Sequence, residues 1–543
     1  MSTRDVTSAL LGAAMARPWH LPPKRNKLTV RRDLPVPMGD GVTLLADHYA
    51  PVVDTPRPTV LVRCPYGRGA AFAGMIARPY AERGYHVLLQ SVRGTFGSGG
   101  TFRPGVAEAA DGQDTVAWLR TQDWFDGRLA TAGPSYLAFT QWALALDPPP
   151  ELRAMVIHIG THDLAGAGSS DGGPFQLYNS LMWSELMAYQ ERVGAIRAMV
   201  RMNRTERRLA PVLAKLPLRA TVDGLGGTGA PWYDEWLSLH LDPTNTYWDG
   251  YRADQALRTV SVPTLLVGGF HDFFADQTLT QYHALHDRGV DVAMTLGPWT
   301  HLTLDQGVAI PESLAWLDKH VAGDAVNGRR EPVRVWVAGL DQWQDLPAWP
   351  PSDTTPTTWH LAPDGALADE ASTGETTFRY DPADPTPSVG GRMMANSGGS
   401  QDNTELESRA DVLTFTGPTL TKPLDVFGTP VVELDVTSDN QYADLFARLC
   451  DVDEQGRSFN VTDQIVRLPV DGIPGEARHV RIPLVDTAYR FLPGHRVRLQ
   501  VSGGAHPRFA RNLGTVDGSA DSAETRATTH QLHHSSSLTL PVR

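Results

Sequence analysis

Residues 129–146 constrain the fold most strongly, because they predict a buried strand, a tight turn and a helix in immediate succession. The strand is the short, mostly apolar run Leu129 to Ala132, and the turn is Gly133-Pro134-Ser135-Tyr136. Helix-forming residues follow until Asp147 and three prolines end the element. A serine in such a turn can present its hydroxyl above a sheet, beside the free N–H groups of the helix start. The turn therefore indicates Ser135 as a nucleophile, and a helix-capping serine is the alternative.

Short strands and helices alternate on both sides of this turn, after a strand pair within residues 28–50. Apolar runs bounded by turn residues predict strands at 59–64, 85–90, 152–159, 262–269 and 290–296. Amphipathic stretches predict helices at 72–83, 111–121, 277–287 and 311–321. Such alternation is typical of a largely parallel sheet with helices on both faces, so the expected fold class is α/β.

Two regions depart from this alternation. Residues 161–255 carry helical stretches, notably 178–202 and 204–216, without a clear strand, which predicts a helical cap over the carboxyl edge of the sheet. From about Glu331 the helices disappear, and strand patterns such as Val333 to Val337 recur between Gly and Pro turns. Roughly 200 residues of such strands predict a β-sandwich of the jelly-roll type.

We therefore expect four segments, because 543 residues are too many for one hydrophobic core. They are the first part of the α/β core at 1–160, the inserted helical cap at 161–255, the second part of the core at 256–328, and the C-terminal jelly-roll β-sandwich at 329–543.

A nucleophilic serine needs a base to take its proton and an acid to hold that base. Asp272 follows the strand predicted at 262–269, and His301 follows the strand predicted at 290–296. The chain order Ser, Asp, His is the order of an α/β hydrolase, and the rival base His271 breaks it by preceding Asp272. We therefore predict Ser135, Asp272 and His301 as the catalytic residues, with a helix-capping Asp272 and a structural His301 as the alternatives.

The oxyanion formed during acyl transfer needs two hydrogen-bond donors. One is expected from the backbone N–H of Tyr136, directly after the serine. The second should come from the loop Cys64-Pro65-Tyr66-Gly67, which follows the first long strand. The residues alone allow two donors in this loop, a backbone N–H and the Tyr66 phenol.

Composition limits the partners and the compartment. The net charge of −13, with no long basic run, argues against nucleic acid or an anionic membrane as a partner, and no apolar run reaches the length of a membrane span. Two cysteines give no disulfide framework, so we expect a cytoplasmic protein; the segment Ala14-Met15-Ala16, which is like a signal-peptide cleavage site, keeps secretion as the alternative. We find no cofactor motif and no metal-ligand cluster, and the glycine-rich loop 93–100 lacks the spacing of a nucleotide-binding loop.

Several motifs together resemble one family of serine hydrolases, which comprises cocaine esterase, the X-prolyl dipeptidyl-peptidases and the α-amino-acid ester hydrolases. The matching motifs run along the whole chain: Asp40-Gly41-Val42-x-Leu44, Arg63-x-Pro65-Tyr66, Val92-Arg93-Gly94, Gln122-x-Trp124, Gly133-x-Ser135-Tyr136, Gly269-Phe270-x-Asp272, Gly297-Pro298-Trp299-x-His301, Arg409-x-Asp411-Val412-Leu413, Leu449-x-Asp451-Val452 and Gly494-His495-Arg496-x-Arg498-Leu499. The resemblance implies an α/β-hydrolase core, a helical cap and a C-terminal jelly roll.

The resemblance also implies roles for individual residues. The Tyr66 hydroxyl is expected to join the Tyr136 N–H in the oxyanion hole. Trp183 and Phe274 stand where the esterases of the family place aromatic pocket walls, and ordinary helix packing is the alternative for Trp183. Two positions depart from the family's usual pattern: Ala138 replaces the glycine three residues after the serine, and Ser91 replaces an Asp. Leu137 stands where the strict G-x-S-x-G pattern of a serine turn has its last glycine.

The choice of family member rests on two positions after Asp272. The amino-ester hydrolases carry acidic residues there for a substrate ammonium group, whereas this chain has Phe274 and Ala275, with Asp276 one step further on. We therefore expect a carboxylic ester hydrolase that acts on a small-molecule ester through an acyl-enzyme. The alternatives are an X-Pro dipeptidyl-peptidase, an α-amino-acid ester or acyl hydrolase, and, remotely, a non-catalytic binding protein. Self-association stays open, and the sandwich is expected to shield the site through contacts such as Met393 and Met394.

Overall fold

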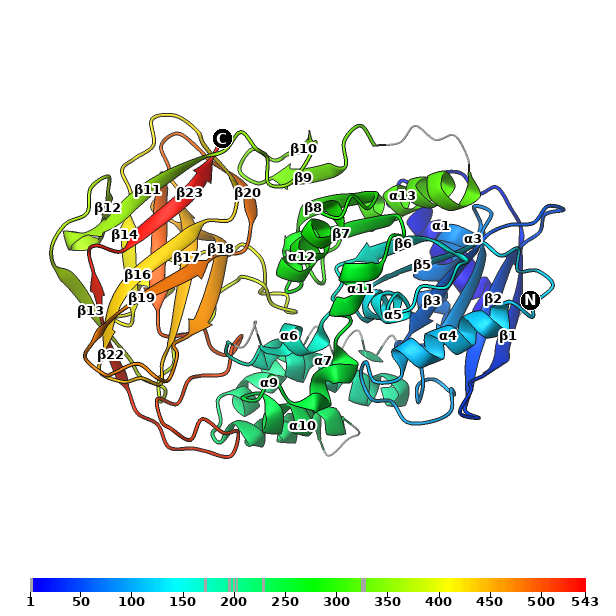
Figure 1. The fold of residues 1–543 in the computed structure, drawn as a ribbon, viewed down its shortest axis with the longest axis horizontal. Helices are drawn as coiled ribbons and strands as arrows, with labels where there is room; N and C mark the ends of the chain where they lie inside the picture. Colours follow the sequence, from blue (N-terminus) through cyan, green and yellow to red (C-terminus); the bar gives the residue numbers. More distant parts are fainter. Residues whose placement is uncertain are drawn as a thin grey trace.

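The computed structural model describes residues 3–169, 173–193, 197–198, 201, 204–226, 230–323 and 329–543. Three bodies pack against one another (Figure 1): an α/β core, a helical cap beside one edge of it, and a β-sandwich at the C-terminal end. The sandwich contacts both the core and the cap. The fold class expected from the sequence, an α/β-hydrolase core with a helical cap and a C-terminal β-sandwich, is confirmed.

Within the described residues, ten strands form the core sheet, in the order β1-β2-β4-β3-β5-β6-β7-β8-β9-β10. Strands β3 to β9 run parallel, and β1, β2 and β10 are antiparallel to their neighbours. The bounds are β1 Leu28–Pro37, β2 Thr43–Pro51, β3 Thr59–Cys64, β4 His86–Ser91, β5 Leu129–Pro134, β6 Leu152–His158, β7 Thr264–His271, β8 Val292–Thr300, β9 Val333–Val337 and β10 Gln342–Leu346.

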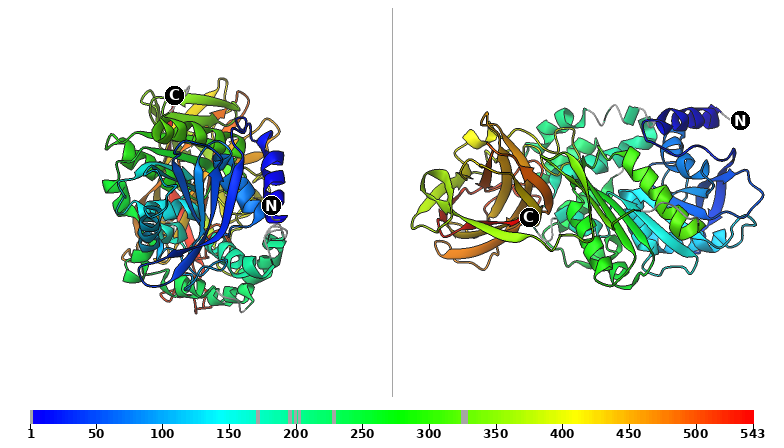
Figure 2. Two further views of the ribbon diagram at one scale, coloured as in Figure 1. Left: turned by 90° about the vertical axis from the view of Figure 1, so that its right-hand side faces the viewer. Right: turned by 90° about the horizontal axis from the view of Figure 1, so that it is seen from above.

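Helices cover both faces of this sheet, as strands buried on both faces require. One face packs against α4 (Glu108–Leu119), α5 (Tyr136–Leu144), α11 (Asp254–Thr259) and α12 (Ala275–His286). The other face packs against α13 (Gln306–Leu317) and the helical segment α2-η1-α3, which runs from Ala70 to Ala81. The N-terminal helix α1 (Thr3–Ala16) lies outside this segment, at the edge of the molecule (Figure 2).

The cap consists of helical elements between β6 and β7. They are α6 (Leu164–Ser169), α7 (Leu177–Val193), α9 (Thr205–Leu213), η3 (Leu218–Leu225), α10 (Pro231–Leu239) and η4 (Thr246–Tyr251). The helix expected at 178–202 corresponds to α7, and part of its expected C-terminal end lies outside the described residues. None of the helices in the described ranges is both long and apolar enough to cross a bilayer.

In the part of the chain that the structure describes, thirteen strands form the sandwich around a separate apolar core. Their bounds are β11 Thr355–Ala362, β12 Ala366–Ala368, β13 Glu375–Tyr380, β14 Val412–Thr416, β15 Leu424–Gly428, β16 Val431–Ser438, β17 Asp444–Val452, β18 Ser458–Arg467, β19 Ala477–Pro483, β20 Thr487–Phe491, β21 Arg496–Ser502, β22 Thr528–His533 and β23 Ser537–Val542.

One strand expectation is wrong. The strand at Val333–Val337 forms, but it pairs in parallel with β8 and belongs to the core sheet instead of the sandwich. Its alternating burial fits either location, because a strand with one buried face has the same pattern in both sheets. The predicted boundaries at residues 160, 255 and 328 stay predictions, although the core sheet itself continues to Leu346.

Candidate active site

Ser135 occupies the sharp turn between β5 and α5, at the carboxyl edge of the core sheet. Its backbone has φ 59° and ψ −124°, a conformation that is strained for a residue with a side chain. The Ser135 N–H donates to the carbonyl of His158 at the end of β6 over 3.0 Å, which holds the turn against the sheet. The turn also needs a glycine at 133, where φ is 153° and a Cβ would lie 2.5 Å from the Cβ of Leu137. The strained turn presents the serine side chain above the sheet.

The unusual Ala138 is accommodated by a glycine on the neighbouring strand end. A Cβ placed on Gly160 would lie only 2.1 Å from the Cβ of Ala138. The methyl group of Ala138 therefore fills the space that Gly160 leaves open. This pair explains how α5 can approach the end of β6 closely without the family's usual glycine in the helix.

The structure brings the three predicted catalytic residues together at the ends of β5, β7 and β8. Nε2 of His301 lies 2.9 Å from Oγ of Ser135, and Nδ1 of His301 lies 2.8 Å from Oδ1 of Asp272. Asp272 is fully buried, and only 7% of the His301 side chain is exposed. Such a chain of contacts can pass a proton from the serine to the imidazole while the carboxylate fixes the ring.

Two aromatic rings flank His301. The ring of Phe273 lies 4.4 Å from the imidazole centroid, and Phe274 meets it edge-on at 5.4 Å. Both follow Asp272 directly, so one short segment supplies the acid and the walls beside the base. We predicted Phe274 but missed Phe273, although its position next to Asp272 at a strand end was a usable signal.

Tyr66 approaches Ser135 from the loop after β3. Tyr66 and Ser135 line the same cavity, and the interaction with the Ser135 side chain partly offsets the rise in the pKa of the phenol. The indole N–H of Trp183, on cap helix α7, donates to the same phenol oxygen over 3.1 Å. Burial raises the pKa of Tyr66 to about 12, so the phenol keeps its proton at neutral pH. Tyr66 can therefore act as a hydrogen-bond donor, and Trp183 is both a cavity wall and a partner of that donor.

The Tyr136 side chain points away from the serine into a buried polar cluster. Its hydroxyl donates to Glu108 over 2.7 Å and accepts from the Gly105 N–H over 2.9 Å. Glu108 pairs in turn with the buried Arg63 at 2.9 Å, while burial raises the pKa of its carboxyl. The backbone N–H of Tyr136 begins helix α5, where N–H groups have no partner within the helix. Its side chain thus anchors the turn, and its N–H is the group available to an oxyanion.

Two cavities meet at Ser135. The smaller, of about 80 Å³, is lined mainly by aromatic and aliphatic side chains, among them Trp183, Phe273 and Phe274. The larger, of about 800 Å³, is lined by His301 and Tyr66 and extends to charged side chains near the N-terminus. Ser135 and Trp183 line both cavities, whereas His301 lines only the larger one.

The acidic positions of an amino-ester hydrolase have no equivalent in the smaller cavity. No Asp or Glu occurs among the described residues that line it. Asp276, the remaining candidate, lies 3.9 Å from Arg392 and lines neither cavity. Ala275, the first residue of α12, is buried in the core. The described wall of this cavity therefore offers no carboxylate to a substrate ammonium group.

The other residues that the sequence pointed to make contacts outside the chain from Asp272 through His301 to Ser135. His271 is half-buried and faces charged side chains of the sandwich, and desolvation lowers its pKa to about 4. Met394 lines the larger cavity, and its N–H donates to Asn179 of α7 over 2.9 Å. Ser91 contacts the guanidinium of Arg68, a residue that the sequence did not single out. In the described ranges, no group of three or more His, Cys, Asp or Glu side chains could hold a metal ion.

Two family models match this chain. Residues 40–303 match the X-Pro dipeptidyl-peptidase (S15 family) model, and residues 325–539 match the model of the X-Pro dipeptidyl-peptidase C-terminal non-catalytic domain. The fold is similar to two solved structures, an α-amino acid ester hydrolase and an aminopeptidase from a marine sediment Thaumarchaeota archaeon. Each has a TM-score of 0.78 and 22% identity over 96% of this chain, and the matches cover 98% and 97% of those chains.

Cocaine esterase from Rhodococcus sp. (strain MB1 Bresler) is 33% identical over 536 residues, which cover 90% of this chain and 93% of that protein. This similarity extends through the core, the cap and the sandwich. The chain therefore belongs to the family of serine hydrolases that contains cocaine esterase and the X-Pro dipeptidyl-peptidases, and it is a carboxylic ester hydrolase.

Proposed function

We propose that the enzyme hydrolyses esters of uncharged acyl groups, with Ser135 as nucleophile, His301 as base and Asp272 as the acid that orients it. The observation that carries the proposal is the contact chain of 2.8 Å and 2.9 Å from Asp272 through His301 to Ser135, next to an aromatic cavity. A cavity whose described lining is mostly apolar and contains no carboxylate suits a neutral acyl group better than a cationic one.

The reaction follows from this arrangement in two steps. His301 takes the proton of Ser135 as the serine oxygen attacks the ester carbonyl, and the Tyr66 hydroxyl and the Tyr136 N–H stabilise the oxyanion. The protonated His301 then donates its proton to the leaving alcohol, which leaves an acyl group on Ser135. Water, deprotonated by the same imidazole, repeats the attack and releases the acid.

The two cavities are assigned by the position of the base. Because His301 must reach the leaving oxygen, the alcohol belongs in the larger cavity, which His301 lines. The acyl group then occupies the smaller cavity, between Trp183 and Phe274. Its size favours a compact acyl group, and its aromatic wall favours a flat or branched apolar one.

The peptidase and amino-ester alternatives need a carboxylate near the acyl group. The carboxylates of the larger cavity, Asp33 and Glu191, lie on the alcohol side and already accept hydrogen bonds, from Arg68 and from the Phe96 N–H. We therefore rank these activities below ester hydrolysis.

The test compares p-nitrophenyl benzoate with Gly-Pro p-nitroanilide on the purified enzyme, with and without Ser135→Ala. We expect turnover of the ester, weak or no turnover of the anilide, and loss of activity in the variant. A fluorophosphonate probe should label the parent enzyme at Ser135 and leave the variant unlabelled. Preference for the anilide contradicts the substrate class, and full activity of Ser135→Ala contradicts the mechanism.

We also propose a cytoplasmic location. Both cysteines, Cys64 and Cys450, are buried and unpaired in the structure, which suits a reducing compartment. Cell fractionation of the producing organism, with N-terminal sequencing of the mature protein, tests this; a shortened N-terminus in a secreted fraction contradicts it.

A further inference from the structure

The loop that carries Tyr66 is short and glycine-rich. It runs from Pro65 at the end of β3 to α2, and Arg68 stands between Gly67 and Gly69. Gly67 has φ 86°, and a Cβ there would lie 2.6 Å from the ring of Phe96. A loop of this kind has little intrinsic rigidity, so the position of Tyr66 depends on what holds its neighbours.

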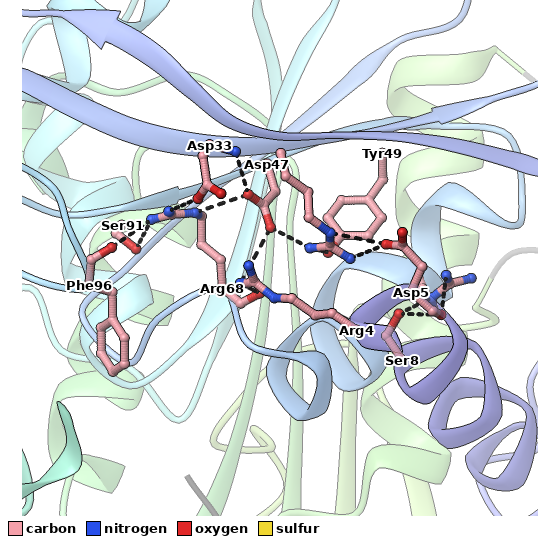
Figure 3. A network of polar contacts seen from close by, with 11 residues as sticks. Arg4, Asp5, Ser8, Asp33, Asp47, Tyr49, Arg68, Ser91 and Phe96 are labelled. Atoms are coloured by element: carbon pink, nitrogen blue, oxygen red, sulfur yellow. Dashed lines mark hydrogen bonds and ion pairs between the residues drawn. The ribbon is translucent and has the colours of Figure 1, made fainter. Parts of the chain in front are cut away.

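Arg68 fixes this loop from within (Figure 3). Its buried guanidinium donates to Asp33 over 2.7 Å, to Asp47 over 3.2 Å and to the hydroxyl of Ser91. A further contact of 3.4 Å reaches the carbonyl of Phe96. The planar guanidinium thus ties the Tyr66 loop to β1, β2, β4 and the loop after β4.

Asp47 is the centre of this network. It is fully buried on β2, and its carboxylate accepts from Arg32 over 2.7 Å and from the Asp33 N–H over 3.0 Å, in addition to Arg68. Arg4 of the N-terminal helix lies 3.6 Å away. A buried carboxylate with this many charged donors holds them in one geometry, because loss of a partner leaves charge uncompensated in the interior.

Helix α1 closes the network from outside. Arg4 donates to the backbone carbonyl of Arg68 itself, and Asp5 pairs with Arg32 (Figure 3). On the next turn, Ser8 accepts from Arg78 of α3 over 2.9 Å. Gly74 of η1 allows α1 to come close, since a Cβ there would lie 3.1 Å from Leu11. The N-terminal helix is thus bonded to both ends of the segment that follows Tyr66.

We propose that Arg68, capped by Arg4 of the N-terminal helix, is a positioning residue for the oxyanion donor Tyr66. This inference rests on the proposed function, in which the Tyr66 hydroxyl stabilises the oxyanion. Displacement of that hydroxyl by a fraction of an ångström weakens a bond that matters most in the transition state. The N-terminal helix accordingly helps to position the oxyanion donor, although it lies at the edge of the molecule.

The experiment is a double-mutant cycle between Arg68→Met and Tyr66→Phe, read as the acylation rate constant and as inhibition by benzeneboronic acid. Arg68→Met keeps the aliphatic stem and removes the guanidinium. We expect it to lower acylation by about tenfold in the parent and by no more than about twofold in Tyr66→Phe. The boronic acid forms a tetrahedral adduct with the serine, in which an oxygen on boron takes the place of the oxyanion. Its inhibition should weaken in the same pattern, with KM little changed.

A second variant of the network, Arg4→Met, keeps the test decisive if Arg68→Met folds poorly, and Arg120→Met serves as a control. Arg4→Met leaves the contacts of the Arg68 guanidinium intact and should show a smaller effect of the same kind, again absent in Tyr66→Phe. Arg120→Met removes an exposed ion pair with Glu151 at 2.8 Å, far from the network, and serves as the control with parental activity.

The outcomes separate the two proposals. Equal losses for Arg68→Met in the parent and in Tyr66→Phe overturn the positioning role. A KM increase that occurs only with bulky alcohols also overturns it, because Arg68 and Arg4 line the larger cavity and would then contact the leaving group directly. If Tyr66→Phe itself has parental acylation, the assignment of the oxyanion donor in the proposed function fails instead.

Discussion

The indole N–H of Trp183 donates a hydrogen bond to the phenol oxygen of Tyr66 over 3.1 Å. This bond joins the cap to the core at the reacting serine. Because it occupies one acceptor position of the phenol, it leaves the phenol proton free to point towards Ser135 and an oxyanion there. A wall of the acyl cavity therefore also sets the orientation of a proposed catalytic donor.

Substitution of Trp183 by Phe should lower kcat by roughly fivefold to tenfold, the equivalent of about 1–1.4 kcal/mol for one hydrogen bond. Phenylalanine keeps an aromatic ring at this position, so KM for a small ester should change little. The control is Trp232→Phe, in the same aromatic cluster, which removes an N–H that donates to Ser184 over 3.1 Å and not to Tyr66. Steady-state kinetics that show equal losses in both variants contradict the role of Trp183.

Tyr136 should contribute through its backbone and not through its phenol. Tyr136→Phe removes the hydroxyl that bonds to Glu108 and Gly105, while the N–H at the start of α5 remains. We expect kcat within about threefold of the parent and a loss of ~1–3 kcal/mol in the free energy of unfolding, because buried polar groups lose a partner. Urea denaturation and ester kinetics measure the two effects. A folded variant without activity contradicts the backbone assignment.

Phe274 should control the preference between neutral and cationic acyl groups. Phe274→Asp places a carboxylate in the smaller cavity, beside the acyl group of the proposed complex. We expect the ratio of kcat/KM for phenylglycine methyl ester to that for phenylacetic acid methyl ester to rise by about tenfold, or ~1.4 kcal/mol. Phe274→Asn is the control of equal size without charge. The same ratio in both variants shows that charge at this position does not select the acyl group.

The proposed catalytic residues could be predicted because each follows a readable strand. Ser135, Asp272 and His301 come directly after buried apolar runs, and the carboxyl ends of adjacent parallel strands meet at one edge. Their chain order then restricted the roles further. The strand at Val333–Val337 could not be assigned to a sheet, because alternation reports how many faces are buried and not which neighbour a strand has.

The contacts that orient the site could not be predicted in the same way. The bond between Trp183 and Tyr66 depends on how the cap docks on the core, and no local pattern encodes that docking. The link from Arg4 to Arg68 joins residues 64 positions apart, and it exists only because α1 packs on Gly74. Propensity and periodicity predict elements, whereas such contacts depend on packing between them.

The stability should fall as the pH falls from 7 to 5, partly because of His158. Burial lowers the pKa of this histidine to about 4, below its ordinary value of about 6.5 in the unfolded chain. Between these values the unfolded chain binds a proton that the folded protein does not, so acid favours unfolding. His158→Gln should reduce the slope of unfolding free energy against pH by up to ~1.4 kcal/mol per unit. Urea titrations at pH 5, 6 and 7 measure it, and an unchanged slope contradicts the prediction.

The close approach of Gly160 to Ala138 gives a reciprocal test of the serine turn. Gly160→Ala places two methyl carbons 2.1 Å apart, so α5 must move away from β6 and Ser135 with it. We expect a loss of ~1–3 kcal/mol in the free energy of unfolding from overpacking, together with a lower kcat. Adding Ala138→Gly removes the opposing methyl group and should recover most of the kcat, although glycine within α5 costs about 1 kcal/mol of stability. Ala138→Gly alone should keep parental kcat. If the double variant is as inactive as Gly160→Ala, this pair does not set the position of the nucleophile.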